Sequence, residues 1–172
     1  MTDKTKHRRA SLIVLGGVAL AAAGFFSLEY SMTPRTSRAD WPAQFQSNGE
    51  RLYFTGVSAS GQPIRAVGDD RHMLMMGGNA CVACHGVDQE GGRLRPSYWT
   101  VVPAITTEAL TGEHGDTGDH AHAAYTRESL AEAITRSVRP DGSGIGSGMP
   151  RWTMSPEDLS DIVAYLLPGD SG

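Results

Sequence analysis

The stretch Cys81-Val82-Ala83-Cys84-His85 carries the most specific chemical information in the chain, and the rest of the sequence is interpreted around it. Its C-x-x-C-H spacing is typical of covalent haem attachment, in which two thiols form thioethers with one macrocycle and the histidine binds the iron. Cys81 and Cys84 are the only cysteines of the chain. The sequence therefore predicts one covalently attached haem c, with His85 as an iron ligand, and no disulfide.

Two other kinds of site use a C-x-x-C pair. A thioredoxin-like redox pair requires a strand and a helix around it, whereas Gly77-Gly78-Asn79 precede this motif and a glycine-rich loop follows it. A structural zinc site needs about four ligands, usually from two such pairs, and the sequence contains no second pair. The surrounding sequence therefore favours haem attachment.

The imidazole of a metal-bound histidine commonly donates its second N–H group to a fixed acceptor, which sets the orientation of the ring. We expect a backbone carbonyl around Pro103 to accept this hydrogen bond from His85. An ordinary loop proline is the alternative interpretation of Pro103.

The second iron ligand is expected just after the glycine-rich segment 143–148, where Met149 is followed by Pro150. Backbone freedom in the segment would let the Met149 thioether reach the iron, and Pro150 would stiffen its approach. The alternatives are Met154, the methionine-rich segment 73–76 and the histidines of residues 111–122. Met154 directly precedes a predicted helix cap, which makes it a less suitable ligand.

Two segments have compositions that could bind metal. Residues 73–76 hold three methionines, for which we favour flexible packing against the haem over copper binding. Residues 111–122 are rich in glycine, aspartate and histidine, and their three histidines could coordinate Zn²⁺ or Cu²⁺. No apolar residues support that segment, so we favour a solvated loop, with docking or pH sensing as a further role for His114, His120 and His122.

The N-terminus differs from the rest of the chain in charge and hydropathy. Residues 1–10 carry a net charge of +3, and because the whole chain carries −4, the remainder carries −7. Residues 12–28 contain no charged side chain and would span roughly 25 Å as a helix, slightly less than the hydrocarbon thickness of a bilayer. Such an acidic domain is not expected to bind nucleic acid.

These features predict a cytoplasmic basic tail over 1–10 and an uncleaved transmembrane anchor over 11–30. A cleaved signal peptide is the alternative, because Ala21-Ala22-Ala23 offers a small-residue cleavage site. Either interpretation exports the bulk of the chain. We expect the protein at the inner (cytoplasmic) membrane, with its haem domain facing the periplasm or the cell exterior.

The remaining chain is divided into a linker over 31–47, a haem-binding domain over 48–168 and a tail over 169–172. Residues 51–57 and 63–67 are rich in β-branched and aromatic side chains and are separated by a short turn sequence. They predict a small β-hairpin.

Two helices are predicted near the C-terminus. Thr126 would cap the first, whose buried face would hold Leu130, Ile134 and Val138, and Pro140-Asp141-Gly142 would end it. Ser155 and Pro156 begin the second. Its buried stripe is formed by Leu159, Ile162, Val163 and Leu166, with Tyr165 at the edge.

Taken together, these motifs resemble class I (mitochondrial-type) cytochromes c over roughly residues 72–167. The matching residues are the C-x-x-C-H run, Pro103, Gly148-Met149-Pro150 with Trp152, and the last helix. The resemblance implies an all-α fold around one haem, with His85 and Met149 as axial ligands. It further implies that the Pro103 carbonyl accepts the His85 hydrogen bond and that Tyr165 packs near the haem.

One departure from the family concerns its first helix, which normally runs directly into the haem motif. Gly49-Glu50-Arg51-Leu52-Tyr53 looks like the start of that helix, yet about 27 residues separate it from Cys81. Relative to the family, the predicted hairpin and the methionine-rich segment are therefore an insertion between this helix start and the haem motif.

The resemblance implies an electron carrier and not an enzyme. The expected partners are a quinol:cytochrome c reductase, as electron donor, and a terminal haem-copper oxidase, as acceptor. Two alternatives remain. The protein could be a haem subunit of an oxidase or dehydrogenase complex, or it could hold a five-coordinate haem that binds gas or peroxide.

Overall fold

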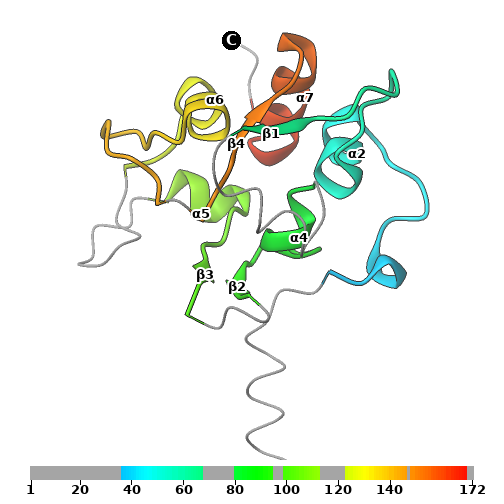
Figure 1. Cartoon of the computed structure of the whole chain (residues 1–172), viewed down its shortest axis with the longest axis horizontal. Helices are drawn as coiled ribbons and strands as arrows, with labels where there is room; N and C mark the ends of the chain where they lie inside the picture. Colours follow the sequence, from blue (N-terminus) through cyan, green and yellow to red (C-terminus); the bar gives the residue numbers. More distant parts are fainter. Residues whose placement is uncertain (1–35, 68–79, 95–98, 113–122, 147, 170–172) are drawn as a thin grey trace, which may run out of the picture. The chain divides into compact units, whose positions relative to one another are not determined.

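The structure is a computed structural model that describes residues 36–67, 80–94, 99–112, 123–146 and 148–169. Figure 1 shows the order of its elements along the chain. The helices are η1 (Arg38–Asp40), α2 (Asn48–Thr55), α4 (Val82–His85), α5 (Thr107–Thr111), α6 (Arg127–Arg136) and α7 (Pro156–Leu166). The strands are β1 (Arg65–Val67), β2 (Gly92–Arg93), β3 (Val101–Val102) and β4 (Arg151–Thr153).

The predicted basic tail and the predicted anchor at 11–30 both lie outside the described residues. In the part of the chain that is described, none of the helices has the length and apolar character needed to cross a membrane.

Helix α2 replaces the first strand of the predicted hairpin. The Ser47 side chain accepts a hydrogen bond from the backbone N–H of Glu50 at the start of the helix, and Gly56 ends it with a φ of +66°. These two caps outweigh the β-propensity of the aromatic and β-branched residues between them. The prediction of a strand over 51–57 is therefore wrong, and a first helix is present.

Helices α2 and α7 cross in direct backbone contact. A Cβ atom on Gly49 would lie only 2.0 Å from the carbonyl oxygen of Asp161, so a larger residue would force the helices apart. Beside this crossing the Asn48 side-chain amide donates hydrogen bonds to Asp158, at 2.9 Å, and to Asp161, at 2.8 Å. The crossing ties the start of the described domain to its end.

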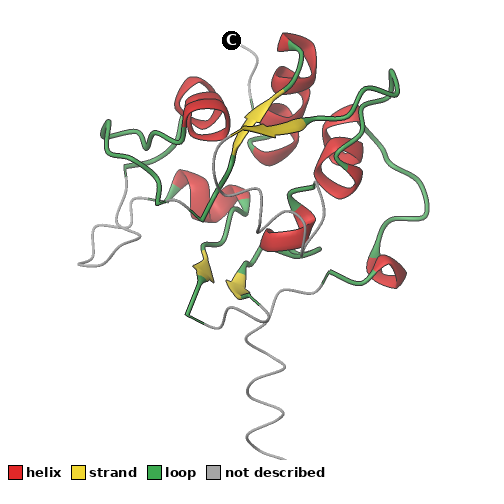
Figure 2. Ribbon diagram, viewed as in Figure 1, coloured by secondary structure: helices red, strands yellow, loops and turns green. Residues whose placement is uncertain are grey.

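Two small antiparallel sheets complete the architecture (Figure 2). Strand β1 pairs with β4, with Ala66 opposite Trp152, and β2 pairs with β3, with Gly92 opposite Val102. The predicted second hairpin strand at 63–67 is thus partly present, but its partner lies some 85 residues further along the chain. Within the predicted hairpin only an isolated bridge joins Val57 to Pro63.

Helix α6 begins as predicted and ends earlier than predicted. Thr126 and Ser129 form a reciprocal capping box at its start, whereas Ser137 ends it in the left-handed region with a φ of +56°. Val138 therefore lies outside the helix, where it forms a bridge with Gly144. Helix α7 begins at Pro156 with Ser155 as its cap, as the sequence predicts.

The hydrophobic core is formed where α2, α6 and α7 meet the sheet of β1 and β4. Its buried side chains include Leu52, Tyr53, Phe54, Ile64, Val82, Leu130, Ile134, Trp152, Ile162, Val163 and Leu166. Trp41 and Phe45, in the predicted linker, pack on Phe54 with ring centroids 5.6 and 5.9 Å away.

Candidate haem-binding site

A single helical turn presents the C-x-x-C-H motif. Cys81 directly precedes α4, and its carbonyl accepts hydrogen bonds from the N–H groups of Cys84, at 3.1 Å, and His85, at 2.9 Å. Val82, between the two cysteines, is buried in the hydrophobic core and anchors the turn there. Gly86 then redirects the chain with a φ of +80°. Both half-buried thiols and the imidazole are therefore held by one short rigid element.

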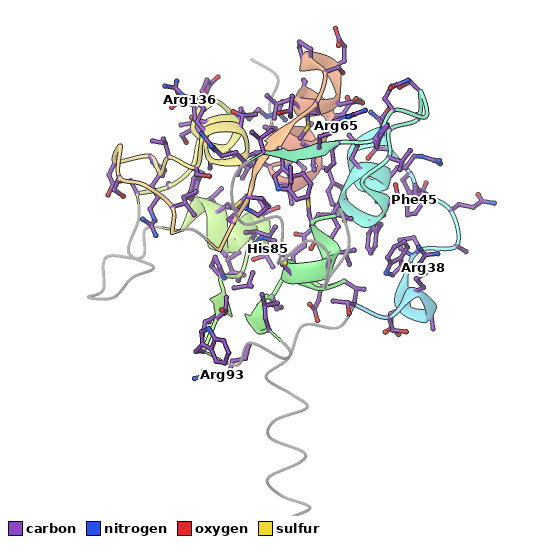
Figure 3. All side chains as sticks on the ribbon, viewed as in Figure 1. Arg38, Phe45, Arg65, His85, Arg93 and Arg136 are labelled. Carbon is purple, nitrogen blue, oxygen red and sulfur yellow. The ribbon has the colours of Figure 1, made fainter. Side chains whose placement is uncertain are left out.

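The His85 ring is oriented by the carbonyl group that the sequence indicates. Its Nδ1 lies 3.1 Å from the carbonyl oxygen of Pro103, so the hydrogen bond expected between these residues is present. If Nδ1 donates to this oxygen, Nε2 keeps a free lone pair, as a metal ligand requires. Figure 3 shows the His85 side chain directed toward the interior, whereas Arg93 lies at the periphery.

Burial also fixes the charge state of this imidazole. His85 is only 7% exposed, and its burial lowers its pKa to about 4, although the hydrogen bond to Pro103 opposes the shift. The ring is therefore neutral near pH 7. A neutral imidazole is the form that binds a metal ion.

The Pro103 carbonyl is itself held in place by the loop that follows α4. The N–H of Gly91 donates to the His85 carbonyl at 2.9 Å, and the N–H of Ile105 donates to the Gln89 carbonyl at 2.8 Å. Gly91 has a φ of +65°, and a Cβ atom there would lie 2.3 Å from the Val102 oxygen and 2.6 Å from the Pro103 oxygen. Only glycine permits this close approach.

The two thiols lack the character of reactive redox cysteines. Burial raises the pKa of Cys81 to about 12 and also raises the pKa of Cys84. Reactive cysteines, in contrast, have lowered pKa values and sit in electropositive surroundings. The environment of the motif thus suits thiols that are consumed in thioether bonds, which carry no proton.

Tyr53 is a residue of this site that the sequence did not single out. Its buried hydroxyl donates a hydrogen bond of 2.6 Å to the carbonyl of Gly86, the residue after His85. Its ring centroid lies 5.5 Å from that of Tyr165, which is half-buried on α7. Tyr53 lies within the wrongly predicted strand, and recognition of the Ser47 cap would have placed it on a buried helical face.

Met149, the predicted second ligand, lies in the C-terminal part of the chain, directly before Pro150 and β4. Met149 is half-buried and packs against the core, as does Met154. A Cβ atom on the preceding residue, Gly148, would lie 3.8 Å from Cγ2 of Thr100. Gly148 therefore lies beside Thr100, which stands three residues before Pro103 in the sequence.

Of the other residues predicted to contact the haem or a metal, the structure describes some and not others. Trp152 is buried in β4, and only 6% of it is exposed. The methionines of 73–76 and the histidines His114, His120 and His122 lie outside the described residues. Among the residues that are described, no three His, Cys, Asp or Glu side chains gather as a metal site of those ligands would require.

Comparison with known proteins agrees with this site. The family model for cytochrome c matches residues 73–169, which is more than half of the chain. No curated protein and no solved structure gives a significant match. The chain belongs to the cytochrome c family. It therefore carries covalently bound haem c in a helical fold, and its role is haem-based electron transfer.

Proposed function

We propose that the protein is a class I cytochrome c whose haem iron is bound by His85 and Met149. The observation that carries this proposal is the hydrogen bond between His85 Nδ1 and the Pro103 carbonyl, because it leaves Nε2 of a neutral, buried imidazole for the iron. Cys81 and Cys84 would form the thioethers. The bound haem would supply a one-electron couple between ferric and ferrous iron.

Met149 is the second ligand in this proposal. Its thioether is a soft, neutral donor that favours the reduced state of the iron and raises the reduction potential relative to two imidazoles. Two observations support the choice: Met149 packs against the core, and its neighbour Gly148 approaches Thr100, three residues before Pro103. Trp152 and Tyr165 would contribute to the apolar surroundings of the cofactor.

Two protein ligands leave no iron position for a substrate, so the proposed role is that of an electron carrier and not of an enzyme. A partner must approach the cofactor closely for electron transfer. Cys81 and Cys84 are both half-buried, so the edge of the molecule that they line is the proposed point of entry and exit for electrons.

We further propose that the domain works at the inner membrane, on its periplasmic or outer side. The support is the uncharged segment 12–28 with basic residues before it. Anchoring would raise the local concentration of the domain at membrane-bound partners. The proposed donor is a quinol:cytochrome c reductase and the proposed acceptor is a haem-copper oxidase.

The test compares the full-length protein in detergent with its Met149→Ala and Met154→Ala variants. Met154 is the matched control, because it is also a half-buried methionine packed against the core. We expect the wild type and Met154→Ala to be low-spin and to bind carbon monoxide only slowly when reduced. Met149→Ala should bind carbon monoxide rapidly and show a lower reduction potential. An unchanged Met149→Ala variant would overturn the proposed ligation.

A further inference from the structure

The chain between α2 and α4 is longer than the family pattern leads one to expect, and its described part forms the strand β1. This strand pairs with β4 in an antiparallel register, with Arg65 opposite Thr153 and Val67 opposite Arg151. Figure 1 shows the two strands side by side between α2 and α6. The added segment therefore contacts one particular element of the C-terminal half.

That element directly follows the proposed iron ligand. Only Pro150 separates Met149 from the first residue of β4. The central residue of the strand, Trp152, is buried in the core, and α6 packs against the same strand. The position of β4 consequently limits how far Met149 can move.

The chain before Met149 is held by hydrogen bonds to the end of α6 and within its own loop. The Ile145 N–H donates to the Ser137 carbonyl at 2.8 Å, and the Met149 N–H donates to the Gly146 carbonyl at 3.3 Å. A Cβ atom on Gly142, Gly144 or Gly146 would meet no other atom within 4 Å, so this segment is open on its outer side. Glycines also lose the most backbone entropy when they become ordered. Met149 is therefore restrained from both sides, and β4 supplies the restraint that involves the added chain.

Strand β1 is itself firmly attached to α2. Ile64, the residue before it, is 3% exposed, and its N–H donates to the Gly56 carbonyl at 2.9 Å. The N–H of Ser58 donates to the Gln62 carbonyl, also at 2.9 Å, and closes the turn between them. Because α2 is packed closely against α7 at Gly49, this attachment joins β1 to the crossing of the two helices.

We propose that β1 is a brace that keeps Met149 within reach of the iron by holding β4. Its residues act as positioning residues and do not touch the iron. The proposal rests on the proposed ligation by Met149, and it assigns a purpose to the added chain. Loss of the brace should increase the population in which the Met149 segment is open, without loss of the fold.

The first test is the Ala66→Pro variant of the full-length protein, because proline at the centre of a three-residue strand disrupts its pairing. Ser47→Ala is the matched control, since it removes the cap of α2 and destabilises the fold without touching β1 or β4. We measure hydrogen exchange of residues 151–153 and the rate of carbon monoxide binding to the reduced protein.

We expect Ala66→Pro to accelerate carbon monoxide binding by about tenfold or more and to abolish exchange protection of 151–153. Ser47→Ala should change neither by more than about twofold. The result that overturns the proposal is equal behaviour of the two variants. Ile64→Ala is the second variant, since it loosens the attachment of β1 without a proline, and it should change both readouts in the same direction.

Met149→Ala separates this proposal from the one on which it rests. Should Met149→Ala bind carbon monoxide rapidly while Ala66→Pro resembles the wild type, Met149 is a ligand and the brace is refuted. Unchanged behaviour of Met149→Ala would refute the ligation and the brace together. Support for the brace requires rapid binding in Met149→Ala and accelerated binding in both β1 variants.

Discussion

The two sides of the proposed haem site are built in different ways. On the His85 side, three restraints come from within about twenty residues of the motif: the α4 turn, the Gly91 contact and the Pro103 carbonyl. The hydrogen bond from Tyr53 of α2 is the one distant contribution described above. On the Met149 side, the nearby glycine segment is held to the end of α6, and the strand β4 that follows Met149 pairs with β1, which lies far away in the sequence. The position of His85 is thus specified largely by local structure, whereas the position of Met149 depends also on long-range packing.

The largest effect is expected from removal of the two thiols, Cys81 and Cys84, on the His85 side of the site. A Cys81→Ser and Cys84→Ser double variant cannot form thioethers, so we expect no covalently attached haem. Mass spectrometry of the denatured protein measures this directly. The control is Ala83→Ser, which changes the residue between α4's Val82 and Cys84 and should retain one haem per chain. A double variant that still carried covalent haem would contradict the assignment.

Next in size is the effect of Gly91→Ala, which disturbs the acceptor of the His85 hydrogen bond. The added Cβ atom would meet the Val102 oxygen at 2.3 Å, and we expect the free energy of unfolding to fall by about 3 kcal/mol or more. Chemical denaturation followed by absorption measures the loss. The haem spectrum should change as well, since the orientation of His85 depends on this loop.

Gly61→Ala is the control for backbone strain alone. Gly61 also has a positive φ, +83°, but a Cβ atom there would meet nothing within 4 Å. We expect a loss of only about 1 kcal/mol and an unchanged spectrum. Equal losses in the two glycine variants would show that the close approach at Gly91 does not matter.

The smallest effect is expected from Tyr53→Phe, which removes the hydrogen bond to the Gly86 carbonyl. The variant leaves the Gly86 carbonyl only its longer hydrogen bond of 3.4 Å from the Gln89 N–H. This loss should cost about 1–2 kcal/mol of unfolding free energy, measured by chemical denaturation. Tyr165→Phe is the comparison, and because its hydroxyl is only half-buried its loss should cost less. The carbon monoxide behaviour of both variants should match the wild type, because neither residue restrains Met149.

Features set by neighbouring residues, several of them on the His85 side of the site, were predicted well from the sequence. The C-x-x-C-H spacing, the acceptor at Pro103 and the start of α7 at Pro156 all follow from short patterns with a direct physical meaning. Helix α2 was predicted as a strand over 51–57 because Tyr53 and Phe54 favour strands, while the caps at Ser47 and Gly56 were overlooked. The early end of α6 rests on the left-handed conformation of Ser137, a residue that rarely adopts it.

Contacts between segments that are distant in the sequence could not be predicted in the same way. No local pattern in residues 65–67 indicates pairing with residues 151–153, because the partner is selected by the tertiary packing of Trp152 and Ile64. The Gly91-Gly92 pair indicates a turn from sequence alone. The atoms that a Cβ on Gly91 would meet, however, belong to Val102 of β3 and to Pro103, and no local pattern shows that they lie there. Sequence patterns thus indicate local turns and helix caps better than they indicate pairing between distant segments.

The measurement that tests the central claim most directly is the NMR spectrum of the reduced protein with isotope-labelled methionine methyl groups. A methionine bound to haem iron lies over the macrocycle, whose ring current moves its methyl resonance far upfield. We predict one such resonance in the wild type, retained in Met154→Ala and lost in Met149→Ala. An upfield methyl resonance that persists in Met149→Ala would contradict the account.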